Sequence, residues 1–233
     1  MAHLFWRRLK CPAEMDYRVI VQARMSSKRF PGKMLAPFAG RPLVEAVLGR
    51  LASTVGRERI VLATSADLTD APLAAYSESL GYQTFRGDLA NVFSRFQNCA
   101  RAFPAEWIVR ICGDSPMIDG KLILLLLQYR DADVDLVTNV AVRSFPPGQS
   151  VEILNARTLA GIDSAELAEA EQEHPTQIFY RNPQRFRIRN VKGSNPQWPK
   201  LSFVVDTLDD LRRLDALVRS GEYPEFAAGA VSE

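Results

Sequence analysis

The sequence predicts an α/β protein built around a mostly parallel sheet. Three apolar runs, at 17–21, 59–64 and 107–112, are rich in β-branched residues, and each is followed by a longer segment with helical periodicity. Repeated strand-then-helix units of about 25 to 30 residues are typical of a parallel sheet with helices on both faces. The chain of 233 residues is long enough to bury one such core.

The first part of the chain alternates strands and helices in order. The strand at 17–21 leads into a loop of small and basic residues, and a helical pattern resumes at Arg41–Leu43. Further strands are expected at 59–64, 82–86, 107–112 and 135–139, with helices at 70–80, 90–102 and 119–129 between them. These elements would make up the parallel part of the sheet.

The alternation stops after Asn139, where a turn-rich segment at 144–148 begins a different part of the chain. We expect a strand at 151–154, helices at 156–171 and 175–180, strands at 185–189 and 203–206, and a helix at 208–219. We therefore divide the chain into an N-terminal extension (1–16), one domain (17–220) with an inserted lobe at about 140–200, and a C-terminal tail (221–233).

The composition is that of an ordinary globular protein. The formal net charge of +2 is too small for a general nucleic-acid binder. Nowhere do about 18 apolar residues follow one another, so we expect no insertion into a membrane. The three cysteines, Cys11, Cys99 and Cys112, are too few and too scattered for a disulfide framework or a zinc site, which indicates a reducing, cytoplasmic setting.

The segment 22–35 carries the main functional signal. Between small residues and a Pro-Gly pair it has four cations within ten residues: Arg24, Lys28, Arg29 and Lys33. A basic loop at the carboxyl end of a strand is where an open α/β sheet receives phosphate groups. The alternative is a solvated surface loop, which is common with this composition. Neither the Gly-x4-Gly-Lys-Ser/Thr nor the Gly-x-Gly-x-x-Gly phosphate motif is present.

Two aspartates follow predicted strands and could form a metal site. Asp114 comes after the strand at 107–112, and Asp206 ends the strand at 203–206. At the carboxyl edge of a parallel sheet both would face the basic loop. Because Mg2+ prefers one or two carboxylates together with phosphate oxygens and water, the pair would suit a magnesium–nucleotide complex. The alternative is that each aspartate only caps the helix that follows it.

Several runs of this sequence, taken in order, resemble the sugar cytidylyltransferases. The run 22–33 resembles the N-terminal signature of that family, in particular its spore-coat-polysaccharide-type branch, which is related to the CMP-Kdo and acylneuraminate cytidylyltransferases. The resemblance continues through 60–65, 85–88 with 91–96, 109–116, 173–174 with 180–183, and 205–211. It covers about residues 17 to 215.

The resemblance implies a Rossmann-like, glycosyltransferase-A-type fold and an enzyme that activates a sugar with CTP and releases pyrophosphate. It also implies that Arg24, Lys33 and Asp114 are catalytic and that Asp114 and Asp206 bind Mg2+. The residues that it assigns to CTP are Gln22, Ala23, Arg24, Arg29, Lys33, Thr64, Arg86, Gly87 and Asp88. Clustered cations suit this chemistry, because attack at the α-phosphorus places charge on its oxygens and on the departing pyrophosphate.

The sequence departs from the family pattern where the acceptor sugar would bind. The family's Gly-x-Asp-Val-Glu run reads Gly-Gln-Ser-Val-Glu at 148–152, and Pro175 stands where Val usually follows the Glu-His pair. The expected acceptor-binding residues are Arg143, Glu152, His174 and Arg181. His174 could orient the acceptor or act as a base, or it could only cap or pack a helix. An arginine could bind the carboxylate of an acidic sugar in bidentate fashion.

We therefore expect a Mg2+-dependent cytidylyltransferase that transfers CMP from CTP to an acidic, nonulosonic or Kdo-like sugar. Its role would be the synthesis of surface-polysaccharide precursors, as a homodimer joined through the inserted lobe. Two alternatives stay open. A nucleotide-sugar-dependent glycosyltransferase would carry an Asp-x-Asp metal motif after a central strand, but the triplet at 133–135 precedes its strand. A catalytically silent relative would bind nucleotide without turnover.

Overall fold

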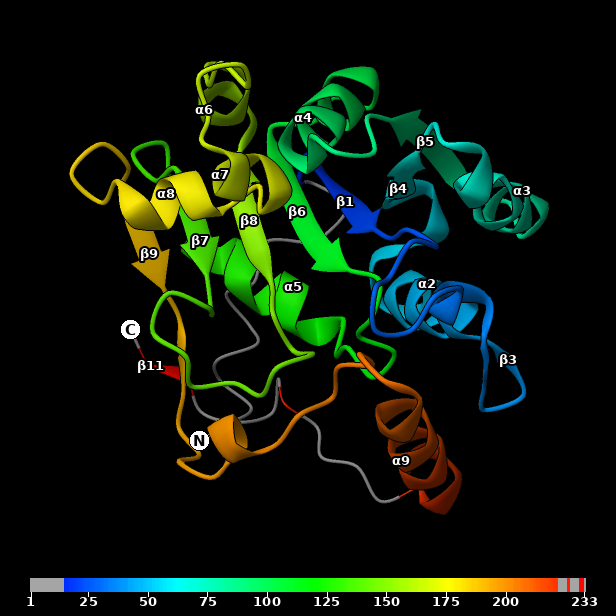
Figure 1. Ribbon diagram of the computed structural model, residues 1–233. Helices are drawn as coiled ribbons and strands as arrows, with labels where there is room; N and C mark the ends of the chain where they lie inside the picture. The colour runs from blue at the N-terminus through cyan, green and yellow to red at the C-terminus, as the bar shows by residue number, and fades with distance from the viewer. Residues whose placement is uncertain (1–14, 222–225, 227–230, 233) are drawn as a thin grey trace.

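The computed structural model describes residues 15–221, 226 and 231–232 (Figure 1). The expectation of an N-terminal extension therefore lies almost entirely outside the described residues, and so does most of the expected C-terminal tail. Within the described part of the chain, no helix is long and apolar enough to cross a membrane.

A seven-stranded sheet forms the centre of the molecule. Its strands, in spatial order, are β5 (Gln83–Gly87), β4 (Ile60–Ser65), β1 (Tyr17–Gln22), β6 (Trp107–Cys112), β8 (Glu152–Asn155), β7 (Leu136–Thr138) and β9 (Ile188–Asn190). The first four are parallel to one another, and β8 is antiparallel to both of its neighbours. The predicted α/β fold with a mostly parallel sheet is confirmed.

The sheet is buried on both faces because successive residues of its central strands point to opposite sides. In β1, Val19 and Val21 pack into one apolar cluster, whereas Ile20 packs into the other. The first cluster contains side chains of α2 (Leu43–Val55), α5 (Lys121–Leu126) and α9 (Leu208–Ser220). The second contains side chains of α4 (Val92–Ala102), α6 (Ala156–Ala160) and α8 (Gln177–Arg181). These helices cover the two faces of the sheet (Figure 1).

The remaining elements are short and lie around this core. Along the chain, the helix α3 (Ala71–Ser79) connects β4 to β5, and α7 (Glu169–Glu173) precedes α8. Two small antiparallel pairs join β2 (Pro37–Phe38) to β3 (Arg41–Pro42) and β10 (Lys192–Gly193) to β11 (Val231–Ser232). Single 3-10 turns occupy η3 (Lys33–Leu35), η4 (Arg57–Arg59), η5 (Leu68–Asp70), η6 (Leu127–Tyr129) and η7 (Trp198–Lys200).

Three predicted elements are present in the structure with different bounds. The helix expected at 156–171 is interrupted, because α6 ends at Ala160 with Gly161 as its C-cap and the Asp163 carboxylate then accepts the N–H of Ala165 in a local turn. The helix expected at 119–129 is α5 followed by the turn η6. The strand expected at 185–189 begins only at Ile188, because the N–H groups of residues 185 and 186 donate back to the Asn182 carbonyl.

The predicted strand at 203–206 is wrong. The segment runs outside the sheet, with its N–H groups donating to single carbonyls of two different loops. The Phe203 N–H donates to Pro147 over 2.8 Å, and the Val205 N–H donates to Asp114 over 2.9 Å. A ladder cannot form against two separate loops. Asp206 therefore reaches the carboxyl edge of the sheet as part of an extended loop, not as a strand end.

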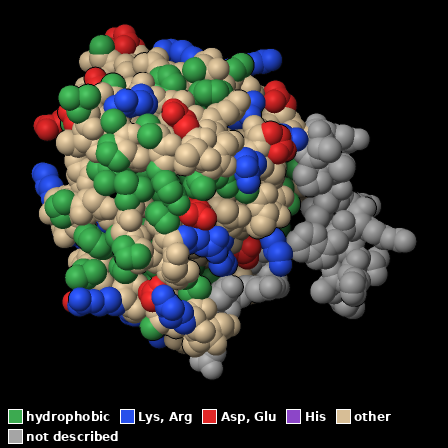
Figure 2. Space-filling view, turned by 90° about the vertical axis from the view of Figure 1, so that its right-hand side faces the viewer, with side chains coloured by type: hydrophobic (Ala, Val, Ile, Leu, Met, Phe, Trp, Pro, Cys, Tyr) green, Lys and Arg blue, Asp and Glu red, His purple; other side chains and the backbone are tan. Residues whose placement is uncertain are grey.

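The segment 140–200 contributes β8, β9 and the helices α6 to α8. Its role as an inserted lobe within one domain stays a prediction. On the side of the molecule around α3 and β5, acidic and basic side chains of the described residues are interspersed (Figure 2). This mixture of signs agrees with the small net charge of the chain.

Candidate active site

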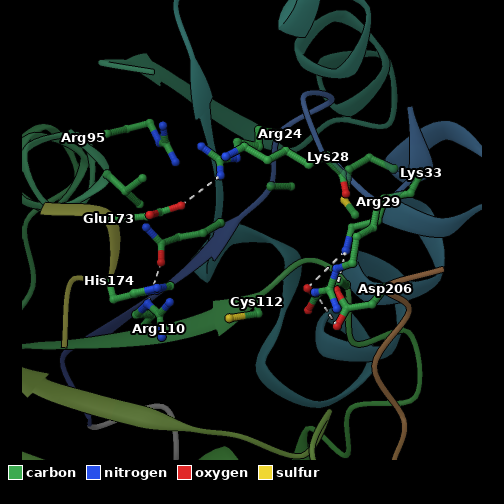
Figure 3. Close-up of a pocket in the computed structure, with 16 residues that line it drawn as sticks. Arg24, Lys28, Arg29, Lys33, Arg95, Arg110, Cys112, Glu173, His174 and Asp206 are labelled. Carbon is green, nitrogen blue, oxygen red and sulfur yellow. Dashed lines mark hydrogen bonds and ion pairs between the residues drawn. The ribbon is translucent and has the colours of Figure 1, made fainter. Parts of the chain in front are cut away.

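A pocket of about 400 Å³ opens at the carboxyl ends of β1 and β6, beside the first turn of α4 (Figure 3). Charged side chains gather at its two ends. The aspartate end contains Lys28, Arg29, Lys33, Asp114 and Asp206. The arginine end contains Arg24, Arg95, Arg110, Glu173 and His174. Gln22 and Cys112, the last residues of β1 and β6, also line the pocket.

The basic loop is fastened to the sheet by a buried carboxylate. Asp70, fully buried before α3, accepts the N–H of Met25 over 2.6 Å and that of Ser65 over 3.1 Å. The Gly32 N–H donates to the Met25 carbonyl over 2.9 Å, and Gly32 adopts a positive φ of 74°, which favours glycine. The loop after β1 is therefore folded back on itself with its cations directed to the pocket.

Lys33 joins the two aspartates at the aspartate end. Its Nζ lies 3.3 Å from Asp114 Oδ2 and 3.5 Å from Asp206 Oδ1, and it donates to the Val205 carbonyl over 2.7 Å. Arg29 adds an ion pair to Asp206 at 2.9 Å. The Lys33 side chain is nearly buried, so its charge depends on these oxygens for compensation.

The aspartates do not act as helix caps here. The N-cap of α9 is Thr207, whose hydroxyl accepts the Asp210 N–H, and the Asp210 carboxylate accepts the Thr207 N–H in return. The helix that follows Asp114 is α5, and its N-cap is Gly120. Both aspartate side chains therefore face the cations of the pocket, and the capping alternative fails for each.

The three oxygens around Lys33 Nζ suit a hard cation. No group of three or more His, Cys, Asp or Glu side chains gathers as a metal site within the described residues. Two carboxylates and a backbone carbonyl nevertheless match the ligands that Mg2+ takes from a protein when phosphate oxygens and water supply the rest. The donor set fits a magnesium ion that arrives with a nucleotide.

At the arginine end, Arg24 and Glu173 form a loose ion pair of 3.6 Å between partly exposed side chains. His174 follows Glu173 at the end of α7 and also lines the pocket. The structure thus brings this histidine beside the basic loop, which its place in the sequence alone could not establish.

Arg110 forms the floor of the arginine end together with a buried network. Its Nε donates to Gln22 Oε1 over 2.5 Å, and its Nη1 pairs with Glu152, which is buried. The Tyr180 hydroxyl donates to the second oxygen of Glu152 over 2.6 Å. Burial acts to lower the pKa of Arg110, but Cys112 and Glu152 outweigh it and the pKa is raised. Burial and Glu152 both raise the pKa of Tyr180.

Arg95, on the first turn of α4, is a pocket residue that sequence reasoning missed. Only 2% of it is exposed, and its Nη1 donates to the carbonyls of Asp88 and Leu89 over 2.6 and 3.5 Å. Its pKa is lowered, first by burial and then by the charge of Arg24. The segment 91–96 belonged to the family resemblance, and that was the one sequence signal that could have selected it.

Eight of the residues predicted from sequence line the pocket: Gln22, Ala23, Arg24, Arg29, Lys33, Asp114, His174 and Asp206. The others do not line it: Thr64, Arg86, Gly87, Asp88, Arg143, Glu152 and Arg181.

Most of these outlying residues have structural contacts. Thr64 is fully buried. Arg86 donates to the carbonyls of residues 65, 66 and 67, and the Asp88 carboxylate accepts the N–H groups of residues 90 and 91. Arg143 is exposed with its Nη1 3.5 Å from Ser150 Oγ, and Arg181 is exposed on α8. The predicted roles of these residues in binding CTP or the acceptor stay predictions.

A family model described as Cytidylyltransferase matches residues 18–211. The spore coat polysaccharide biosynthesis protein SpsF of Bacillus subtilis (strain 168) is 30% identical over 223 residues, which cover 91% of this chain and 91% of that protein.

Two solved structures have the same fold. A cytidylyltransferase from Leptospira borgpetersenii superposes with a TM-score of 0.84 at 26% identity, over 92% of this chain and 90% of the other. A CMP:2-keto-3-deoxy-manno-octonic acid synthetase, solved in complex with CTP, superposes with a TM-score of 0.67 over 88% of this chain and 99% of the other. Because the identity of the second pair is only 18%, that comparison establishes a shared fold and nothing more.

Proposed function

Because the chain belongs to the cytidylyltransferase family and is a nucleotidyltransferase, we propose that it transfers CMP from CTP to a hydroxyl of an acidic sugar and releases pyrophosphate. The observation that carries this proposal is Lys33, held between Asp114 and Asp206 beneath a loop of further cations. The CTP complex of the Kdo-activating synthetase with the same fold supports CTP as the nucleotide.

The aspartate end would bind the triphosphate. Arg29 and Lys33 now pair with carboxylates, and both can exchange these for phosphate oxygens when a nucleotide enters. In the transition state, negative charge grows on the α-phosphoryl oxygens and on the leaving pyrophosphate. Positioned cations stabilise that charge more strongly than they stabilise the ground state, which lowers the barrier.

Asp114, Asp206 and the Val205 carbonyl would hold Mg2+, in the space that the Lys33 ammonium takes now. A bound magnesium ion supplies a Lewis acid that neutralises phosphate charge. The chain's own part is to keep the two carboxylates adjacent, which it does through the Val205–Asp114 backbone hydrogen bond. Lys33 would then be free to contact the phosphates.

The arginine end would receive the acceptor sugar. Excess positive charge there suits an acidic sugar of the Kdo or nonulosonic type. The synthetase with the same fold is named for a sugar acid of this type, 2-keto-3-deoxy-manno-octonic acid. His174 would orient the attacking hydroxyl or accept its proton, with Arg143, Glu152 and Arg181 as further acceptor residues. The name of the Bacillus relative supports a role in precursors of surface polysaccharide. A cytoplasmic homodimer joined through the segment 140–200 completes the proposal.

The glycosyltransferase alternative gains no support. Asp133 is exposed and pairs with Arg187, and the Asp135 carboxylate accepts the Thr158 hydroxyl and the Arg187 N–H. Neither lines the pocket. An Asp-x-Asp pair that served a nucleotide-sugar would need free carboxylates facing it.

The test is pyrophosphate release from CTP, with UTP and ATP as comparisons, in the presence of Mg2+ and a panel of acidic sugars. We expect release only with CTP and only when an acceptor is present. Release from no combination would refute the proposed transfer, and CTP binding without release would favour the catalytically silent relative.

A further inference from the structure

Gln22 has an unpaired hydrogen-bond donor beside the pocket that it lines. It is the last residue of β1, and in the register of the sheet it stands next to Cys112, the last residue of β6. Its side-chain Oε1 accepts from Arg110 over 2.5 Å, but its buried Nε2 has no partner among the described residues. Because a buried N–H group without an acceptor costs free energy, this amide is a candidate for contact with a ligand.

The orientation of the Gln22 amide is fixed by its partner. A guanidinium group only donates hydrogen bonds, so the glutamine atom that faces Arg110 must be the oxygen. The Nε2 atom, with its two N–H groups, must then face away from Arg110. Gln22 can therefore give a ligand a donor, whereas its acceptor oxygen is already in use.

Arg110 is itself held by a chain of contacts that ends in α8. Cross-strand pairing sets Arg110, Glu152 and Thr138 in one row, on the face of the sheet that α4 and α8 cover. Arg110 Nη1 pairs with Glu152, and the Tyr180 hydroxyl donates to the other oxygen of Glu152 over 2.6 Å. The Thr138 hydroxyl lies 3.0 Å from that of Tyr180. This network holds the Gln22 amide in one orientation before any substrate binds.

The position of Gln22 is where the two ends of the pocket meet. Figure 3 shows Cys112 between Arg110 and Asp206, and Gln22 is paired with Cys112 on the neighbouring strand. In the proposed reaction the aspartate end holds the triphosphate and the arginine end holds the acceptor. The α-phosphorus, which the acceptor attacks, must then lie between the two ends. A donor at this place is suited to contact an oxygen of the α-phosphoryl group.

We propose that the Gln22 amide donates a hydrogen bond to a non-bridging oxygen of the α-phosphoryl group and stabilises the charge that grows there in the transition state. This inference rests on the proposed function and adds a catalytic residue to it. Glu152 and Tyr180 are positioning residues, because they reach the substrate only through Arg110 and the amide. A donor that is already oriented needs no rearrangement during the reaction, which is why such donors lower a barrier.

The amide keeps its own protons while the substrates react. The acceptor oxygen forms its bond to the α-phosphorus as the bond from that phosphorus to the pyrophosphate oxygen breaks. The electron pair of the broken bond leaves with pyrophosphate, and the hydroxyl proton of the acceptor passes to a base such as His174.

The first test separates the donor from the support that Gln22 gives to Arg110. Gln22→Met removes both, whereas Gln22→Glu keeps an oxygen for Arg110 and removes the N–H groups. The readout is kcat for pyrophosphate release at saturating CTP, Mg2+ and acidic sugar. We expect kcat to fall about 100-fold in both variants, the usual cost of losing one such donor. If Gln22 only supported Arg110, Gln22→Glu would keep the kcat of the wild type.

A second test avoids the charge that Gln22→Glu adds and probes the phosphate oxygen directly. It compares the two diastereomers of cytidine 5′-O-(1-thiotriphosphate), in which sulfur, a weak hydrogen-bond acceptor, replaces one or the other non-bridging oxygen. In the wild type only one diastereomer loses the hydrogen bond from Gln22. The ratio of the two kcat values should therefore change by about 10-fold in Gln22→Met, which has no such bond to lose. A purely structural role would leave the ratio unchanged.

The matched control is Gln83→Met, at an exposed glutamine at the start of β5 and outside the pocket. It should keep both the kcat and the ratio of the wild type. Tyr180→Phe removes the far end of the network without entering the pocket. It should lower kcat less than Gln22→Met does, and it should add little to Gln22→Met, because both act through the same amide. Should Gln22→Met fail to fold, Gln22→Glu replaces it in the comparison of diastereomers, since it keeps the contact with Arg110.

The inference is overturned if Gln22→Glu keeps the kcat of the wild type or if the ratio of diastereomers is the same with and without the amide. It is also overturned if Gln22→Met raises only the KM of the acceptor, because the amide would then bind the sugar in the ground state. Failure of the proposed function would look different. In that case the wild type itself would release no pyrophosphate from CTP with any acidic sugar, and the inference would fall with it.

Discussion

The two ends of the pocket contain similar cations but balance them differently. At the aspartate end, Lys33 and Arg29 are paired at short distances with Asp114 and Asp206. At the arginine end, Arg110 is neutralised by Glu152, whereas Arg24 has only a loose partner and Arg95 has an unpaired donor. The first end can exchange one cation for another and release its side chains to phosphate. The second can only gain an anion.

The largest effect is expected from the ion pair in which Glu152 compensates the positive charge of Arg110. Glu152→Gln would leave a nearly buried guanidinium without its counter-charge, and breaking such a pair typically costs about 4 kcal/mol. We expect the free energy of unfolding, measured with urea, to fall by about that amount. Glu173→Gln removes the exposed carboxylate at the same end of the pocket and should change the free energy of unfolding by less than about 1 kcal/mol. Equal effects would mean that Arg110 is not buried with its partner.

The next effect concerns the aspartate end. Asp114→Asn should lower turnover about 100-fold, because groups that stabilise charge in such a transition state typically contribute about 3 kcal/mol. The readout is steady-state pyrophosphate release at saturating CTP. Asp133→Asn, at a carboxylate 82% exposed outside the pocket, is the matched control and should keep wild-type turnover. Unchanged turnover in Asp114→Asn would remove this residue from the chemistry.

Substitution of Lys33 tests whether a divalent cation can replace the lysine ammonium group at the aspartate end. In Lys33→Gln the two carboxylates lose their internal ammonium, so they should bind a free divalent cation about 10-fold more tightly, since the competing charge lies within 4 Å. Electron paramagnetic resonance of Mn2+ without nucleotide measures this directly. Lys28→Gln, at an exposed cation of the same loop, should leave the affinity near that of the wild type. Weaker Mn2+ binding in Lys33→Gln would contradict the exchange.

The aspartate end could be predicted from sequence far better than the arginine end. The basic loop and Asp114 follow β1 and β6, and adjacent parallel strands end at the same edge of a sheet. Asp206 was expected at the correct place for a wrong reason, because the loop that carries it is fixed by hydrogen bonds to two other loops. Strand periodicity cannot reveal such contacts.

Arg95 and Asp70 could not be found in that way. An arginine on the first turn of an amphipathic helix has the pattern of a solvent-facing residue. In the structure it is buried, and Gly87 leaves room for it where β5 packs against α4. Asp70 has the pattern of a helix start, yet its carboxylate fastens the loop 45 residues earlier in the chain. Both depend on tertiary contacts that local sequence does not encode.

The smallest expected effect comes from the helix that supports the aspartate end. Asp206 immediately precedes the Thr207–Asp210 capping box of α9, a helix of 13 residues, whereas Glu173 ends α7, a helix of 5. Thr207→Ala should lower the free energy of unfolding by about 1 kcal/mol, the usual cost of losing an N-cap. Urea denaturation measures this, with Thr69→Ala in the exposed turn after β4 as a control.

Thr207→Ala should also change how the free energy of unfolding depends on pH in the acid range. Burial acts to raise the pKa of Asp210, but the hydrogen bonds from Thr207 outweigh it, and the pKa is lowered. A carboxylate with a depressed folded-state pKa stabilises the protein above its unfolded pKa of about 4, and this stabilisation is lost as the pH falls through the folded value. Thr207→Ala removes the side-chain part of that shift, so the difference in unfolding free energy between variant and wild type should narrow below about pH 4. A constant difference from pH 7 to pH 3 would show that the Asp210 charge takes no part in the cap.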